Sequence, residues 1–120
     1  MHDLETSVAL VATEFQRCQK ILAALGDETR QHLILEMMRM SDCRGARVGE
    51  ITQKTNLSRP AVSHHLGILK EAGVINVRRE GTKNYYYFDA QPDALNQLQN
   101  LIAHTREIMA QLPDRSGAEE

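Results

Sequence analysis

Residues 48–73 have the sequence VGEITQKTNLSRPAVSHHLGILKEAG, and this stretch decides the fold. Its first part allows only about two helical turns before Asn56 and Ser58, two side chains that favour helix starts. Ser58 is placed to cap a second helix in which Pro60 falls in the first turn, where its missing N–H costs nothing. That helix continues over 61–72 and ends at a glycine. The stretch therefore predicts a short helix, a tight turn and a second helix.

A β-hairpin is predicted directly after the second helix. Residues 74–79 and 83–88 are two runs rich in β-branched and aromatic side chains, which are typical of strands. The turn between them, 80–82, contains Glu-Gly, which is a weaker hairpin signal than Asn-Gly.

Three amphipathic helices are predicted around this motif. Apolar residues recur at three- and four-residue steps over 5–25, which indicates one helix. A second helix follows an N-cap at 27–28 and ends before the polar loop 41–45, and a last helix extends from Pro92 to Pro113. The apolar residues expected on their faces are Val8, Val11, Phe15, Cys18, Leu22 and Leu25 in the first helix, Leu33, Ile34, Met37, Met38 and Met40 in the second, and Leu95, Leu98, Leu101, Ile102, Ile108, Met109 and Leu112 in the last.

The first and last helices carry more apolar surface than so small a domain can cover. We therefore expect them to pair with a second copy of the chain in a symmetric dimer. At 120 residues the chain fits one domain, with a folded part over 1–113 and a mobile acidic tail over 114–120. The predicted fold is mainly α with a small β-hairpin, a winged helix-turn-helix of about five helices.

Composition favours a globular protein of the cytoplasm. Hydrophobic residues make up 42% of the chain and charged residues 25%, which excludes disordered and collagen-like classes. No apolar run approaches the roughly 20 residues that cross a bilayer, and the first five residues, MHDLE, are acidic rather than basic like the start of a signal peptide. We expect no membrane partner.

The net charge of -2 hides an uneven distribution. Residues 44–88 contain eight basic and three acidic side chains, a net charge of +5, whereas the other residues contain six basic and thirteen acidic ones, a net charge of -7. The basic segment coincides with the predicted motif and hairpin, the arrangement that places one helix in the major groove of DNA. The alternative is that these charges are ordinary solvated surface.

Several motifs in this order carry a family resemblance. They are LAALGDETR at 22–30, VGEI at 48–51, LSRPAVSHHL at 57–66 and LKEAGVI at 69–75, followed by RREG at 78–81 and the tyrosine run. The sequence resembles the arsenic-repressor (ArsR/SmtB) family of dimeric bacterial winged-helix regulators. The resemblance implies a homodimer built on the first and last helices, which binds an inverted-repeat operator in double-stranded DNA. It also implies that a signal, such as a metal ion or a redox species, releases the repressor.

Candidate DNA contacts lie away from the stripe of Val62, Leu66 and Leu69, which is expected to be buried. These candidates are Lys54, Ser58, Arg59, Ser63 and His64 in the motif, and Arg78, Arg79 and Lys83 in the hairpin. Arg59 has two roles open to it: a bidentate contact to guanine, worth about 1 to 3 kcal/mol of discrimination, or a phosphate contact. The hairpin cations are expected to meet phosphate or the minor groove, with simple solubilising charge as the alternative. His65, near the buried edge, is interpreted as a hydrogen-bonded packing residue.

The resemblance also suggests where metal ligands would lie. Residues 46–50 lack the Cys-x-Cys pair that many relatives carry in the third helix. A second family site joins ligands near the start of one last helix to ligands near the end of the last helix of the partner chain. His104 and Glu107 match its later half, and its earlier half falls near Gln91 and Asp93. Since zinc prefers four ligands, this set is incomplete. Zinc or another divalent metal is the cofactor left open, and surface or interface packing is the alternative role of His104.

Cys18 and Cys43 are the only thiols, too few for a disulfide framework. One hypothesis is a redox pair, a mode known in some relatives. The favoured alternative places Cys18 in the core or the dimer interface and Cys43 in an exposed loop.

The sequence also bears on two other classes of function. An enzyme is disfavoured because the chain lacks Gly-x-Ser-x-Gly, a phosphate-binding glycine loop and His-Glu-x-x-His. A winged helix used only for protein–protein contact remains the alternative to a DNA-binding regulator, because a fold does not fix a function.

Overall fold

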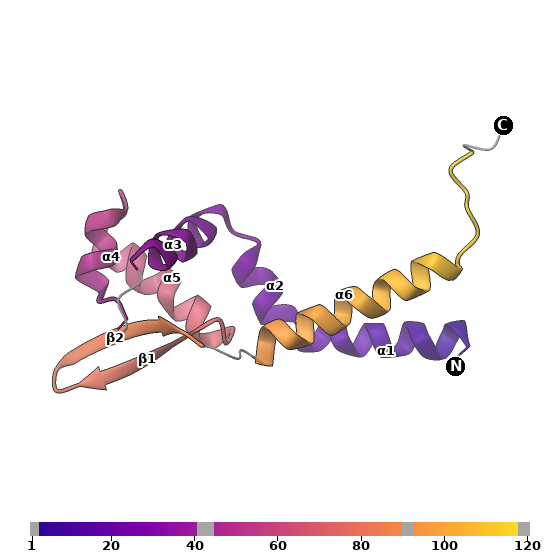
Figure 1. The fold of residues 1–120 in the computed structure, drawn as a ribbon, viewed down its shortest axis with the longest axis horizontal. Coiled ribbons are helices and arrows are strands. Elements are labelled where there is room, and N and C mark those ends of the chain that lie inside the picture. The colour runs from indigo at the N-terminus through magenta and orange to yellow at the C-terminus, as the bar shows by residue number, and fades with distance from the viewer. Residues whose placement is uncertain (1–2, 41–44, 90–92, 118–120) are drawn as a thin grey trace.

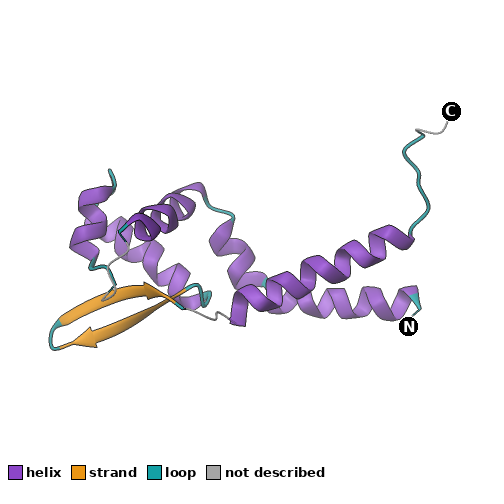
Figure 2. Ribbon diagram, viewed as in Figure 1, coloured by secondary structure: helices purple, strands orange, loops and turns teal. Residues whose placement is uncertain are grey.

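The computed structural model describes residues 3–40, 45–89 and 93–117 (Figure 1). Its elements, in chain order, are α1 (Leu4–Arg17), α2 (Gln19–Leu25), α3 (Glu28–Arg39), α4 (Val48–Lys54), α5 (Arg59–Glu71), β1 (Ile75–Glu80), β2 (Lys83–Phe88) and α6 (Asp93–Gln111). The molecule is elongated, with extents of 60 × 31 × 22 Å. One end, the head, contains α3, α4, α5 and the hairpin, and the other, the arm, contains α1 and α6 (Figure 2).

The predicted helix-turn-helix is confirmed as α4 and α5. Ser58 caps α5, because its Oγ accepts a hydrogen bond from the backbone N–H of Ala61 at 3.2 Å, and Pro60 lies in the first turn as expected. The three residues expected on the buried face of α5, Val62, Leu66 and Leu69, are all fully buried. This face holds the helix against the rest of the head.

The core of the head is built from several elements. Leu33 of α3, Ile51 of α4, Leu66 of α5 and Ile75 of β1 each have no exposed surface. Because burial of each such side chain contributes about 1.5 to 3 kcal/mol, these contacts fix how the helices sit on one another.

The predicted hairpin is also confirmed, with β1 and β2 antiparallel from the pair Ile75–Phe88 to the pair Glu80–Lys83. Ala46 extends the pairing through two backbone hydrogen bonds of 2.8 Å with Tyr86. Before it, Gly45 has φ +92°, and a Cβ there would lie 2.6 Å from the carbonyl oxygen of Tyr86. Only glycine allows this approach, so the segment before α4 is tied to the hairpin.

The single helix expected over 5–25 is wrong, because the chain breaks at Cys18 into α1 and α2. Cys18 has φ -94° and ψ 5°, outside regular helix geometry. Beside the break, the side-chain amide of Gln19 donates to the carbonyl of Phe15 at 3.3 Å. The break lets α1 pack along α6 while α2 packs on α3 and α5, two directions that one straight helix could not serve.

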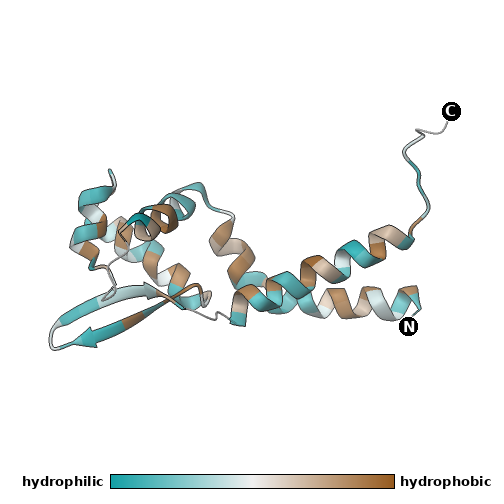
Figure 3. Cartoon of the chain, viewed as in Figure 1, coloured by the Kyte–Doolittle hydropathy of each residue, from teal (hydrophilic) through white to brown (hydrophobic). Residues whose placement is uncertain are grey.

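The apolar faces of the terminal helices are buried only in part within the chain. Val11, Cys18 and Leu101 are buried. The large apolar residues that stay exposed are Leu4, Val8, Leu10, Phe15 and Leu22 in α1 and α2, Leu35 and Met38 in α3, and Leu95, Ile102, Met109 and Leu112 in or after α6. These exposed side chains confirm the predicted excess of apolar surface on the terminal helices. Figure 3 shows the hydrophobic residues that recur along α1 and α6.

The last helix is described from Asp93 to Gln111, and Pro92, where the sequence predicts its start, lies outside the described residues. Among the helices that the structure describes, none is long and apolar enough to cross a membrane.

Two leucines of α3 offer a matched test of this core. Leu33→Ala should lower the free energy of unfolding by about 2 to 5 kcal/mol, because Leu33 is fully buried and its truncation leaves a cavity. Leu35→Ala, on the same helix at 49% exposure, should change it by less than about 0.5 kcal/mol. Urea unfolding at one protein concentration measures both, and equal losses would contradict the assignment of the core.

Candidate nucleic-acid interface

The solvent-facing side of α5 carries the predicted contacts of the motif. Arg59, Ser63 and His64 are exposed, and so is the capping residue Ser58. Their exposure follows from the buried stripe, since helical periodicity turns the intervening positions outward. Hydroxyl, imidazole and guanidinium groups are all suited to base edges or phosphate oxygens.

Arg59 lies at the junction of α5 and α4. Its Nη1 is 3.7 Å from the position that a Cβ on Gly49 would occupy. The guanidinium therefore rests against α4 in the free protein. Lys54, in the last turn of α4, is exposed.

A groove of about 590 Å³ between α2 and α5 contains two lysines that the sequence analysis did not single out. It is lined by Ser63 and His64 together with Lys70 of α5 and Lys20 of α2. Lys20 is 3.9 Å from Glu71, but both side chains are 75% exposed, so this ion pair holds the ammonium group weakly. Lys70 was visible inside the motif, whereas Lys20 joins this surface only because α2 packs on α5.

The three hairpin cations differ in their surroundings. Arg78 is half-buried, donates from Nε to Glu80 at 2.6 Å and lies 5.2 Å from the centre of the Tyr85 ring. Arg79 and Lys83 are exposed, and Nε of Arg79 donates to the carbonyl of Gly81 at 2.9 Å. Arg78 thus takes part in contacts within the hairpin, and Arg79 and Lys83 present their charge to solvent.

The residues proposed as metal ligands do not form a site within one chain. Nδ1 of His104 lies 2.8 Å from both carboxylate oxygens of Glu14 on α1. Glu107 lines the same small hollow as His104, but Asp93 is eleven residues earlier on the same helix, about 16 Å away along its axis. In the described part of the chain no three His, Cys, Asp or Glu side chains come together as metal ligands would. One chain therefore supplies fewer ligands than a zinc site needs, and the site between the last helices of two chains stays a prediction.

Glu14 was missed by the sequence analysis, although a signal for it exists. It lies on α1 between Val11 and Cys18, both of which are buried, at the helical spacing that places it on their side. Its side chain is only 12% exposed.

Cys18 has the surroundings of a packing residue. It is fully buried, and burial, with a smaller effect from Glu14, raises the pKa of its thiol. A raised pKa leaves less of the reactive thiolate at neutral pH. Cys43 lies outside the described residues, so the redox pair stays a prediction.

The helix-turn-helix of α4 and α5, followed by the β-hairpin, defines the winged helix-turn-helix class of proteins. The family model for the bacterial regulatory proteins of the arsR family matches residues 27–77. The transcriptional repressor SdpR of Bacillus subtilis is 36% identical over 84 residues, which cover 68% of this chain and 89% of that protein. A helix-turn-helix-type transcriptional regulator of Methanocaldococcus jannaschii is 36% identical over 74 residues, 62% of this chain and 80% of that protein.

A solved structure agrees with these relatives. The fold is similar to that of an ArsR-like transcriptional regulator from Rhodococcus sp. RHA1, with a TM-score of 0.65, 21% identity and coverage of 82% of this chain and 89% of the other. The chain belongs to the arsR family of bacterial regulatory proteins.

Arg79 provides a test of the hairpin as a backbone contact. Arg79→Ala should weaken binding to all duplex sequences alike and reduce the slope of log affinity against log salt by about 1, because one phosphate contact is lost. Arg106→Ala removes an exposed arginine of α6 in the arm. It is the matched control and should leave the slope unchanged. Fluorescence titration of labelled duplexes measures both, and a loss confined to one DNA sequence would contradict the assignment.

Proposed function

We propose that the protein is a homodimeric transcriptional repressor that binds an inverted-repeat operator in double-stranded DNA. In each protomer α5 lies in the major groove, and the hairpin lies along the backbone. The observation that carries this proposal is the exposed side of α5, where Arg59, Ser63 and His64 face solvent and the last two line the groove that contains Lys20 and Lys70.

Charge supports DNA as the partner. The segment that forms α4, α5 and the hairpin lies within residues 44–88, whose net charge is +5. Lysine and arginine that neutralise phosphates release counterions from DNA, which is the main source of affinity for any duplex. The side chains on α5 then add the base contacts that select one sequence. The protein acts by binding, as its family does, and not as an enzyme.

The arm supports a dimer. Val8 and Phe15 on α1 and Ile102 and Met109 on α6 are each between 43% and 64% exposed. Such an apolar surface on adjacent helices is typical of an interface between copies. A twofold dimer would present its two copies of α5 to two half-sites of the operator. The centres of such half-sites are separated by about one helical turn of DNA, roughly 34 Å. The signal that releases the repressor, a metal ion or a redox species, stays a prediction.

Salt dependence distinguishes this function from a protein–protein module. With an operator selected by the protein from random duplexes, affinity should fall by about 10³-fold or more between about 50 and 200 mM salt, as expected for several phosphate contacts. An apolar protein interface would hardly respond to salt. Fluorescence anisotropy measures the affinity, and a flat response would favour the protein–protein module.

Ile102 tests the arm. Ile102→Glu should convert the dimer to a monomer, because it places a charge in an apolar interface. Operator affinity should then fall at least about tenfold, since the two half-sites are no longer bound together. Leu35→Glu, on α3 at 49% exposure, is the control and should remain dimeric. Sedimentation velocity gives the mass, and a variant Ile102→Glu that is still dimeric would place the interface elsewhere.

A further inference from the structure

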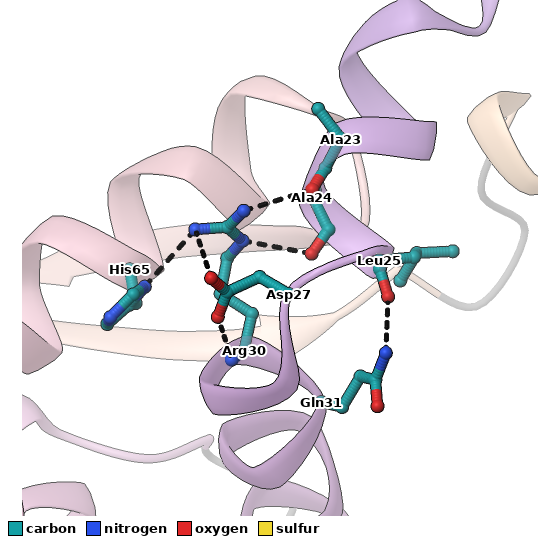
Figure 4. A network of polar contacts seen from close by, with 7 residues as sticks. All are labelled: Ala23, Ala24, Leu25, Asp27, Arg30, Gln31 and His65. Atoms are coloured by element: carbon teal, nitrogen blue, oxygen red, sulfur yellow. Dashed lines mark hydrogen bonds and ion pairs between the residues drawn. The ribbon is translucent and has the colours of Figure 1, made fainter.

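Arg30, near the start of α3, joins three segments through one side chain (Figure 4). Its Nε and Nη2 donate to the carbonyls of Ala24 and Ala23 in α2, each at 2.9 Å. Its Nη1 lies 3.3 Å from Nδ1 of His65 in α5 and 3.9 Å from a carboxylate oxygen of Asp27. The side chain is only 12% exposed. These contacts connect the end of α2, through Arg30 of α3, to α5.

The link starts from backbone groups that need partners. The last carbonyls of a helix have no partner within it, and in α2 those of residues 23 and 24 are taken by Arg30, while that of Leu25 is taken by the amide of Gln31 at 2.8 Å. A guanidinium at a helix C-terminus is also favoured by the helix dipole. Arg30 is therefore held in place independently of α5, and its remaining nitrogen is aimed at His65.

The contact with His65 specifies the state of the ring. A guanidinium donates hydrogen bonds and cannot accept them, so Nδ1 must be the acceptor and the ring must be neutral, with its proton on Nε2. A second proton would turn Nδ1 into a donor and place two positive groups 3.3 Å apart. Histidine is the side chain that ordinarily gains this proton between pH 8 and 5.

The other charged groups near the ring do not replace this bond. Asp27 accepts the backbone N–H of Arg30 at 3.0 Å, and this bond, followed by the charge of Arg30 and by that of His65 when its ring is protonated, outweighs desolvation and lowers the pKa of Asp27. Its carboxylate is thus charged across the range in which histidines titrate, and is shared with the guanidinium. The ring of His64 lies 5.5 Å away. Among the described residues, no hydrogen bond or ion pair connects His65 to α4 or β1.

We propose that Arg30 is a positioning residue that fixes α5 against the end of α2 through neutral His65. Protonation of His65 then lowers operator affinity. This inference rests on the proposed function, since it concerns how α5 is presented to DNA. His65 directly follows Ser63 and His64 on α5, so movement of its backbone displaces both predicted contacts. Acid conditions then weaken the specific complex although they add positive charge to the protein.

The test compares wild type with His65→Asn and His65→Leu. Asparagine offers an amide oxygen near the place of Nδ1 that cannot be protonated in this range, and leucine offers no acceptor. The measured quantity is the ratio of affinities for the selected operator and a scrambled duplex, at about pH 8 and about pH 5.5 and constant ionic strength. The ratio removes the general gain in phosphate attraction as histidines acquire charge.

Between the two pH values, the wild-type ratio should fall about tenfold, the effect of one hydrogen bond to a charged group. The ratio of His65→Asn should fall less than about threefold from a value close to wild type at pH 8. His65→Leu should start about tenfold lower and change little. His32→Asn, at an exposed histidine of α3 outside the predicted DNA contacts, is the matched control and should keep the wild-type ratio and its pH dependence.

Other outcomes separate this inference from the proposed function. Equal pH dependence in wild type and His65→Asn would overturn the inference and leave DNA binding intact. Absence of sequence-specific binding by wild type at pH 8 would overturn the proposed function, and this inference with it. In the free protein at about pH 8, imidazole nitrogen chemical shifts should show His65 neutral with its proton on Nε2. The other tautomer would overturn the inference without any measurement of DNA binding. Thermal unfolding of each variant identifies any that fail to fold.

Discussion

Burial of one stripe of α5 is the constraint on which the head depends. Val62, Leu66 and Leu69 have no exposed surface, and helical geometry then dictates which residues of α5 face solvent. A rotation of the helix by one position would bury Ser63 or His64 and expose leucine, at a cost of several kcal/mol. The presentation of the candidate DNA contacts is therefore a by-product of packing, and it needs no separate device.

The arm obeys a different constraint. α1 and α6 pack on each other. This contact covers only part of the apolar surface of each helix, and Phe15 and Ile102 stay about half exposed. The break at Cys18 reconciles the two constraints: it lets the buried Ile21 and Ala24 of α2 join the head while α1 continues along α6. The proposed dimer would bury the exposed apolar side chains of the arm, as the hydrophobic core buries those of the head.

Local signals made most of the fold predictable. The cap at Ser58, the stripe of α5 and the β-prone runs of the hairpin act over a few residues, so periodicity and capping identify them. The break at Cys18 could not be predicted in this way, because the apolar spacing continues through it and its cause is packing against elements distant in sequence. Glu14 with His104 and Arg30 with His65 are also pairings made by the tertiary fold, across 90 and 35 residues.

The overall charge of -2 does not argue against a nucleic-acid partner, because charges act locally in salt water. At physiological ionic strength screening reduces the field of an exposed charge over about 8 Å, whereas the molecule is 60 Å long. Glu5 on α1 and Glu107 on α6 belong to the arm, while Lys54, Arg79 and Lys83 belong to the head. A duplex at the head therefore meets the local excess of +5. The acidic remainder acts mainly on encounters elsewhere on the surface, where it restrains association with DNA of any sequence.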